Sequence, residues 1–342
     1  MGISFRQEIL EAKLLNPLKN FELDTKIAEI RFDPLTGRSS RIVERFAPHV
    51  PKKYDMSDLI EKTKNCFFCA DNVEKVTPRI LPEISSEERI KVGEAVLFPN
   101  LTAYGKYSGV CIFSTAHFIE LGDMTPELVA NNLKASQRYI QLVAAYDPSV
   151  QFCSINSNYL PPAGSSILHP HTQSTIDPVP TNLQREMVAC SKAYYQENQS
   201  VFWLDLVEAE KKDDKRYLGT IGSTAWITSF APLGFHEVQG IVLSQSSLAQ
   251  MSVSEVEDVA AGIARVLKYY SDKNFNSYNL AIYSGPLAGS DSFRVNLRLI
   301  NRFNFEPHYL SDATYFERLH LEGLADERPE DMALELRSYF QQ

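Results

Sequence analysis

The chain has 342 residues, 44% of them hydrophobic, which is enough for one large domain or for two domains with a substantial core. Its formal net charge is −9, and acidic and basic residues are mixed along the chain, which argues against a nucleic-acid partner. No apolar run reaches the ~18 residues that a membrane span needs, and the N-terminal segment is charged from the start, so we expect neither a membrane span nor a signal peptide. Five cysteines, an odd number, argue against a disulfide framework and predict a cytoplasmic location.

The N-terminal half is predicted to start with a short helix over about residues 4–19. A longer amphipathic helix is predicted from Pro126, because Thr125 supplies an N-cap and apolar residues follow at helical spacing. Strands are predicted where short apolar or alternating runs end at turn residues: two within 27–43, joined by a turn at DPLTGR, then 109–115, 151–158 and the strand with HPHTQ (169–173).

The same order of elements recurs in the C-terminal half, which we interpret as an internal duplication of a strand–helix–strand–loop–strand unit. When Ser114 is aligned with Ser244, His117 falls opposite Ser247, and the HPH triplet falls opposite residues 296–298. The second copy therefore lacks these histidines. This difference favours a site confined to the first half, with the second half as scaffold.

The segment Cys66-Phe67-Phe68-Cys69 is a CxxC pair, which is typical either of a redox dithiol or of half a zinc site. Zinc needs two further ligands, and because there is no second CxxC, the remaining candidates are histidines. His117 directly follows a predicted strand, and His169 lies on the strand with HPHTQ. Two thiolates and two imidazoles would form a closed tetrahedral set, as in structural sites. At this point a redox pair and ordinary loop histidines remain open alternatives.

The stretch SSILHPHTQST (165–175) places two histidines and a glutamine at alternate positions. On a strand, His169, His171 and Gln173 would all point to one face. The preceding residues are rich in Asn, Ser, Pro and Gly, which predicts a loop that can bring donors close to a ligand. The alternative is an exposed strand face with two solvated imidazoles.

Taken together, these segments resemble the galactose-1-phosphate uridylyltransferase family, a branch of the histidine-triad superfamily, over roughly residues 28–340. The matching segments, in chain order, are DPLTGR, CFFC followed by TP, VLFPNL, STAH, N(x)5GSS(x)2HPHTQ and ERPEDMALELR. The resemblance implies an α+β fold of two histidine-triad-like repeats with mostly antiparallel sheets and packed helices. It implies a catalytic half at 1–195 that holds the zinc site, a degenerate half at 196–342, and a homodimer.

The resemblance also implies roles for individual residues. His171 would be the nucleophile, and Gln173 would hydrogen-bond the transferred phosphoryl group. Cys66, Cys69, His117 and His169 would hold one structural zinc ion. The substrate contacts would be Asn158 and Ser166 at the phosphates, Asn100 near the ribose, Arg41 and Arg45 as phosphate-binding arginines, and Glu317 at the sugar.

The acceptor half departs from the family pattern. The HxH of the family's second metal site appears here as Asn296 and Arg298, so no second metal is predicted. The sugar-binding segment reads TYFE, with Phe316 where the family has tyrosine, and two further sugar-phosphate contacts appear as Ser311 and Gly323. The resemblance therefore does not predict galactose 1-phosphate as the acceptor.

The predicted function is transfer of a nucleoside monophosphate, with UMP favoured, between a nucleotide-sugar and a sugar 1-phosphate through a covalent nucleotidyl-His171 intermediate. Gln173 stands where histidine-triad hydrolases carry a third histidine, which favours a phosphate rather than water as acceptor. One alternative is a nucleotide or nucleotide-sugar phosphorylase that transfers an adenylyl group to phosphate or another small anion, which Arg298 could bind. Another is a non-catalytic nucleotide-binding protein.

Overall fold

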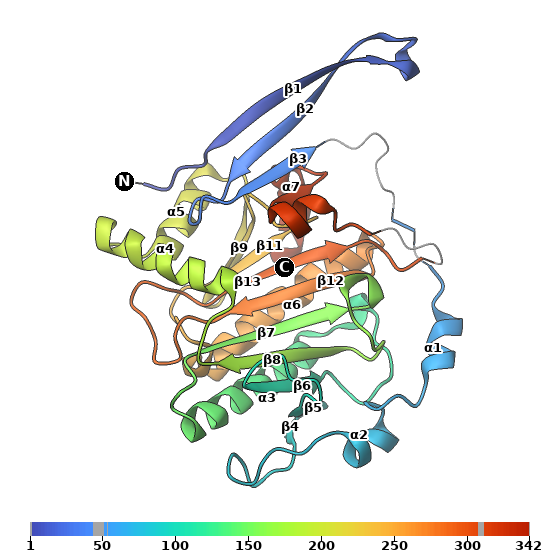
Figure 1. Cartoon of the computed structure of the whole chain (residues 1–342), viewed down its shortest axis with the longest axis vertical. Coiled ribbons are helices and arrows are strands. Elements are labelled where there is room, and N and C mark those ends of the chain that lie inside the picture. Colours follow the sequence, from blue (N-terminus) through green and yellow to red (C-terminus); the bar gives the residue numbers. More distant parts are fainter. Residues whose placement is uncertain (1, 44–50, 53, 307–310, 342) are drawn as a thin grey trace.

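A sheet of ten antiparallel strands forms the centre of the protein, in the order β4-β5-β6-β8-β7-β12-β13-β11-β10-β9 (Figure 1). The computed structural model describes residues 2–43, 51–52, 54–306 and 311–341. The strands of this sheet are β4 (Ile90–Val92), β5 (Ala95–Pro99), β6 (Tyr107–Ile112), β7 (Phe152–Tyr159), β8 (His171–Asp177), β9 (Tyr217–Ile221), β10 (Thr224–Thr228), β11 (Val238–Val242), β12 (Ser277–Tyr283) and β13 (Asn296–Arg302). The helices are α1 (Ser57–Thr63), α2 (Ala70–Val76), α3 (Pro126–Tyr146), α4 (Asn182–Asn198), α5 (Phe202–Asp213), α6 (Val253–Asp272) and α7 (Pro329–Phe340).

The sheet order confirms the internal duplication. One unit runs β4-β5-β6-α3-β7-β8 and the other β9-β10-β11-α6-β12-β13, and the two meet where β7 pairs with β12. The strand registers shift the sequence alignment of the last strands of the two copies by two residues. His171 and Asn296 each begin the last strand of their unit, opposite Ile112 and Ile241 respectively. Asn296, rather than Arg298, therefore lies at the position of His171.

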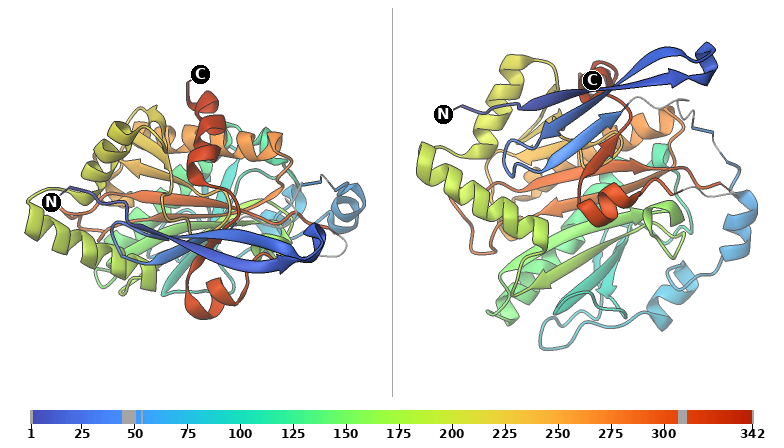
Figure 2. Two further views of the ribbon diagram at one scale, coloured as in Figure 1. Left: turned by 90° about the horizontal axis from the view of Figure 1, so that it is seen from above. Right: turned by 45° about the horizontal axis from the view of Figure 1, so that its top comes forward.

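Helices α3 and α6 pack on one face of the sheet, as Figures 1 and 2 show, and the main hydrophobic core lies between them and the strands. Helix α3 begins at the predicted cap, and α6 is capped at the corresponding end. Thr125 Oγ1 accepts from the backbone N–H of Leu128 at 3.2 Å, and Ser252 forms a capping box with Glu255. These caps satisfy N–H groups that have no partner within the first helical turn.

The opposite face of the sheet is covered at its two ends and accessible in the middle. Over β10 and β11, the covering elements are α4 and α5, which form a second apolar cluster around Trp203. Over β5 and β6, the cover is the segment around α2, where Phe68 and Val73 pack on the strands. Between these clusters, side chains of β8, β7 and β12 are only partly buried.

A smaller sheet has the order β1-β2-β3-β14, with β1 (Gln7–Asn16), β2 (Glu22–Phe32), β3 (Ser39–Val43) and β14 (Gly323–Ala325). The predicted strand–turn–strand over 27–43 is confirmed. The predicted helix over 4–19 is wrong, because this segment forms β1 and pairs residue by residue with β2. An apolar spacing that also fits a helix does not decide between the two structures, and the long-range ladder does. The β1–β2 hairpin extends from the body of the protein as an arm (Figure 1).

Within the described ranges, none of the helices combines the length and apolarity needed to cross a lipid bilayer.

Candidate functional site

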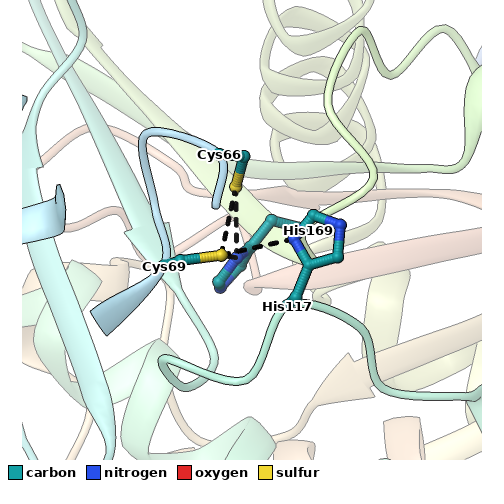
Figure 3. Close-up of side chains that lie close together, drawn as sticks. All are labelled: Cys66, Cys69, His117 and His169. Atoms are coloured by element: carbon teal, nitrogen blue, oxygen red, sulfur yellow. Dashed lines mark hydrogen bonds between the residues drawn. The ribbon is translucent and has the colours of Figure 1, made fainter. Parts of the chain in front are cut away.

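The four predicted metal ligands come together from three distant parts of the chain (Figure 3). Cys66 and Cys69 lie just before the start of α2, His117 lies in the loop after β6, and His169 closely precedes β8. Their ligand atoms all lie within 4.8 Å of one another. Cys66 Sγ is 3.7 Å from Cys69 Sγ and 3.6 Å from His169 Nδ1, and Cys69 Sγ is 3.3 Å from His117 Nδ1. This cluster could hold a metal ion.

The hydrogen bonds around the cluster determine which nitrogen of each histidine faces it. His169 Nε2 lies 2.8 Å from the carbonyl oxygen of Ser114, which can only accept, so Nε2 carries the proton. His117 Nε2 lies 3.1 Å from Thr63 Oγ1, whose own proton is donated to the carbonyl of Leu59. Both Nδ1 atoms are therefore left with their lone pairs directed toward the thiols. Burial lowers the pKa of His169 to about 4, so its ring is neutral.

His171 begins β8 and lies beside the cluster. Its Nδ1 is 2.9 Å from the carbonyl oxygen of His169, so Nδ1 carries the proton and Nε2 has the free lone pair. Burial lowers the pKa of His171, which favours the neutral ring. The ring of Phe68 packs against both histidines, with centroid separations of 5.9 Å to His169 and 5.5 Å to His171.

The strand prediction for HPHTQ holds only in part. Because β8 begins at His171, His171 and Gln173 share the accessible face of the sheet, whereas His169 lies before the strand and points to the cysteines. Asn156 on β7 pairs with Gln173 on β8, so its side chain lies on the same face. Asn156 is not among the residues selected from the sequence, although the alternation in Asn156-Ser157-Asn158 places two asparagines on one face.

Asn158 and Ser166 lie on either side of a tight turn that contains a short 3-10 helix (Pro161–Ala163). The turn uses its own amides: Ala163 and Ser165 donate to the carbonyl of Leu160, and Gly164 donates to that of Pro161. Asn158 is exposed, and its Oδ1 accepts from Asn279 Nδ2 at 2.7 Å. Ser166 is also exposed, and its side chain makes no hydrogen bond to the described residues.

Arg41 and Glu317 are already engaged by neighbouring groups. Arg41 on β3 forms an ion pair with Glu322 at 2.9 Å and stacks on the ring of Phe316. Glu317 accepts from the backbone and hydroxyl of Thr314 at 2.7 and 2.8 Å, and it also lines a cavity of about 210 Å³.

Asn100 directly follows β5, and its side-chain Nδ2 is buried without a hydrogen-bond partner among the described residues. Arg45 lies outside the described residues. Arg298 is buried between Glu237, at 2.6 Å, and Asp33, at 3.2 Å. Its charge is therefore neutralised within the protein, which argues against the predicted small-anion contact.

The comparisons with known proteins agree with this architecture. No protein-family model matches the chain. An uncharacterized protein of Archaeoglobus fulgidus is 34% identical over 336 residues, which cover 98% of each chain. An identity of this level over the whole length indicates common descent.

Several solved structures share the fold, and three of them illustrate the likeness. A galT-like protein from Arabidopsis thaliana has a TM-score of 0.70 at 19% identity and covers 90% of this chain and 98% of its own. An ADP-glucose phosphorylase from Arabidopsis thaliana, solved with bound ADP-glucose, has a TM-score of 0.71 at 19% identity, with 91% and 98% covered. A uridylyltransferase mutant has a TM-score of 0.67 at 18% identity, with 91% and 97% covered.

Proposed function

Because the chain belongs to one family with the Archaeoglobus fulgidus protein and has the fold of the uridylyltransferases, we propose that it is a nucleotidyltransferase that works through a covalent nucleotidyl-His171 intermediate. The observation that carries this proposal is the orientation of His171. Its Nδ1–H donates to a backbone carbonyl, and its Nε2 lone pair lies on the accessible face of the sheet. The site histidines His117, His169 and His171 lie in residues 1–195, and residues 196–342 supply a scaffold.

The reaction has two displacements. In the first, His171 Nε2 attacks the α-phosphorus of a nucleotide donor, a P–N bond forms, the bridging P–O bond breaks, and the electron pair leaves on the departing phosphate. The positive charge on the ring is stabilised by the carbonyl of His169, which accepts from Nδ1–H. In the second displacement, an oxygen of the acceptor phosphate attacks phosphorus and Nε2 leaves. Splitting the transfer means that the two anionic substrates do not have to react directly with each other.

Charge that develops on the phosphoryl oxygens needs donors that are already in position. Gln173 shares the strand face with His171 at the spacing of alternate residues. Asn158 and the hydroxyl of Ser166 lie at the turn that precedes HPHTQ. We assign these three side chains to the transferred and leaving phosphates, and Asn100, with its unpartnered Nδ2, to the nucleoside.

We assign the Cys2His2 cluster to one structural zinc ion. Bonds of about 2.3 Å to sulfur and about 2.0 Å to nitrogen place tetrahedral neighbours about 3.3–3.8 Å apart. Four of the six pairs of ligand atoms, at 3.3 to 3.9 Å, fit this geometry, and all six pairs lie within 4.8 Å. Bound zinc with four protein ligands would supply rigidity and no open coordination position. His169 would then be held at its ring while its carbonyl orients His171.

UMP is the favoured nucleotidyl group and a sugar 1-phosphate the favoured acceptor, as the resemblance of HPHTQ and its flanking segments implies. Adenylyl transfer to inorganic phosphate is the alternative. The acceptor contacts include Glu317, which lines the cavity of about 210 Å³ together with Arg302 and Arg318. We retain Arg41 and Arg45 as candidate phosphate contacts, and Arg41 would have to exchange its ion pair with Glu322 for one with substrate.

We also propose that the protein is a homodimer and that the β1–β2 arm contacts the second copy. Both faces of the arm carry exposed large apolar side chains, namely Ile9, Leu10, Leu14, Leu15, Leu18, Phe21, Leu23 and Ile27. A surface of this kind is typical of an interface rather than of a solvated hairpin. Light scattering on the protein as it elutes from a size-exclusion column should give twice the chain mass. Leu15→Lys combined with Leu23→Lys should give a monomer, and a monomeric wild type would contradict the proposal.

The decisive experiment is intact-protein mass spectrometry after mixing with UDP-glucose, UDP-galactose, ADP-glucose or a dinucleoside polyphosphate, at mildly alkaline pH that preserves P–N bonds. We expect a mass gain of one uridylyl group, which disappears on adding the acceptor and is absent in His171→Ala. A gain of one adenylyl group that inorganic phosphate discharges would indicate the phosphorylase instead. Protein that holds zinc but forms no adduct with any donor would refute the enzymatic assignment and favour a nucleotide-binding protein.

A further inference from the structure

A line of polar side chains connects the C-terminal half to Asn158. Asp312, almost fully buried, binds Arg302, with its Oδ2 2.7 Å from Arg302 Nε. Arg302 Nη1 donates to Asn279 Oδ1 at 2.7 Å, and Asn279 Nδ2 donates to Asn158 Oδ1 at 2.7 Å. The same Nδ2 also donates to the carbonyl of Ala163 at 2.9 Å.

Each amide in this line can take only one orientation. A guanidinium group has donors and no acceptor, so the group of Asn279 that faces Arg302 must be its oxygen. Its NH2 then faces Asn158, where both of its protons are used by Asn158 Oδ1 and the Ala163 carbonyl. Because Asn158 must present its oxygen to Asn279, its own NH2 points away from Asn279.

The free end of Asn158 faces the turn that precedes HPHTQ. Asn158 Nδ2 lies 3.9 Å from the position that a Cβ would occupy on Gly164. The amides of Ala163, Gly164 and Ser165 already donate to carbonyls within the turn. A phosphate bound at this turn must therefore accept hydrogen bonds from other groups. The NH2 of Asn158 is one such donor, because it is directed toward the turn.

We propose that Asn279 and Arg302 are positioning residues that hold Asn158 with its NH2 as a donor to the substrate phosphate. This inference rests on the proposed nucleotidyl transfer and adds a role for the half of the molecule that lacks the site histidines His117, His169 and His171. It gives β12 and β13 a function at the site: Asn279 and Arg302 on these strands determine which end of the Asn158 amide on β7 faces the substrate.

The informative variant is Asn279→Asp, which keeps the size of the side chain but replaces the NH2 by an acceptor. Asn158 then has to turn its NH2 toward the new carboxylate and its oxygen toward the phosphate, which reverses the interaction. We expect adduct formation to slow by about 100-fold, the range typical for loss of one positioned donor. Asn276→Asp is the matched control, because among the described residues Asn276 Oδ1 accepts from the backbone N–H of Phe305 alone, and a carboxylate at this position preserves that bond.

A double-mutant cycle separates positioning from a general structural effect. In an Asn158→Ala background, Asn279→Asp should change the rate by less than about twofold, because the group through which it acts is gone. Effects that multiply would overturn the inference. Arg302→Lys keeps the charge beside Asp312 but loses the fixed bond to Asn279, and it should also slow adduct formation. A wild-type rate in both Asn279→Asp and Arg302→Lys would refute the positioning of Asn158 by Asn279 and Arg302, which we call the relay. That outcome would leave the proposed function intact.

Nucleotide binding tests the relay independently of turnover. Calorimetric titration with UMP and with AMP should show about tenfold weaker binding to Asn279→Asp than to Asn276→Asp, the change in affinity that corresponds to about 1.4 kcal/mol. If the wild type forms no adduct with any donor, the proposed function fails and this comparison decides the relay alone. Equal affinities of the two variants, or no nucleotide binding by the wild type, would overturn it.

Discussion

Phe67 and Phe68 provide a matched pair within the CxxC segment. Phe68 is 8% exposed and packs on the sheet and on the rings of His169 and His171, whereas Phe67 is 66% exposed. Truncating a buried phenylalanine to alanine costs about 3–5 kcal/mol, which includes the cavity left behind. We therefore expect Phe68→Ala to lower the free energy of unfolding by about 3–5 kcal/mol and Phe67→Ala by about 0.5 kcal/mol or less.

The assay is denaturant unfolding of both variants at equal metal content, with the rate of adduct formation measured below the transition. Phe68→Ala should also slow adduct formation, because the ring that packs against the nucleophile is gone and water can enter beside it. Phe67→Ala should retain the wild-type rate. Losses of stability within about 1 kcal/mol of each other would refute the reasoning, since burial would then not be the quantity that matters.

Three further changes test other parts of the structure. Gly262→Ala should lower the free energy of unfolding by about 1–3 kcal/mol in a denaturant titration, because its Cβ would lie 2.0 Å from the buried ring of Trp226; a more stable variant would contradict this. Burial raises the pKa of Glu210 from 4.5 to about 7, so between these pH values the folded chain binds one more proton than the unfolded chain, and the free energy of unfolding should fall as pH rises. Glu210→Gln should flatten this part of the plot of unfolding free energy against pH. An unchanged slope would disprove the raised pKa of Glu210. Cys69→Ser should retain less than about a tenth of the wild-type metal after dialysis against a chelator, measured by elemental analysis, and full retention would exclude Cys69 as a ligand.

Local signals in the sequence were sufficient for the elements whose ends they encode. The cap at Thr125 followed by Pro126 predicted the start of α3, and DPLTGR predicted the turn between β2 and β3. The internal duplication was also visible, because each unit repeats the same order of strand and helix patterns. The four members of the Cys2His2 cluster could be named because CxxC marks the cysteine pair and the family resemblance implies His117 and His169 as the other two ligands.

The partners of each side chain were decided only by the tertiary structure. The segment 4–19 has a spacing that fits a helix, and its pairing with β2 makes it a strand. From the sequence, Arg298 was expected to be available for a small anion, but the packing of β13 places Glu237 and Asp33 around it. Nothing in the sequence marked Asn279 as a site residue, because the orientation that it gives the Asn158 amide depends on Arg302 from another strand. A sequence records which groups a chain carries, but the direction of a hydrogen bond and the neutralisation of a charge depend on neighbours that only folding brings together.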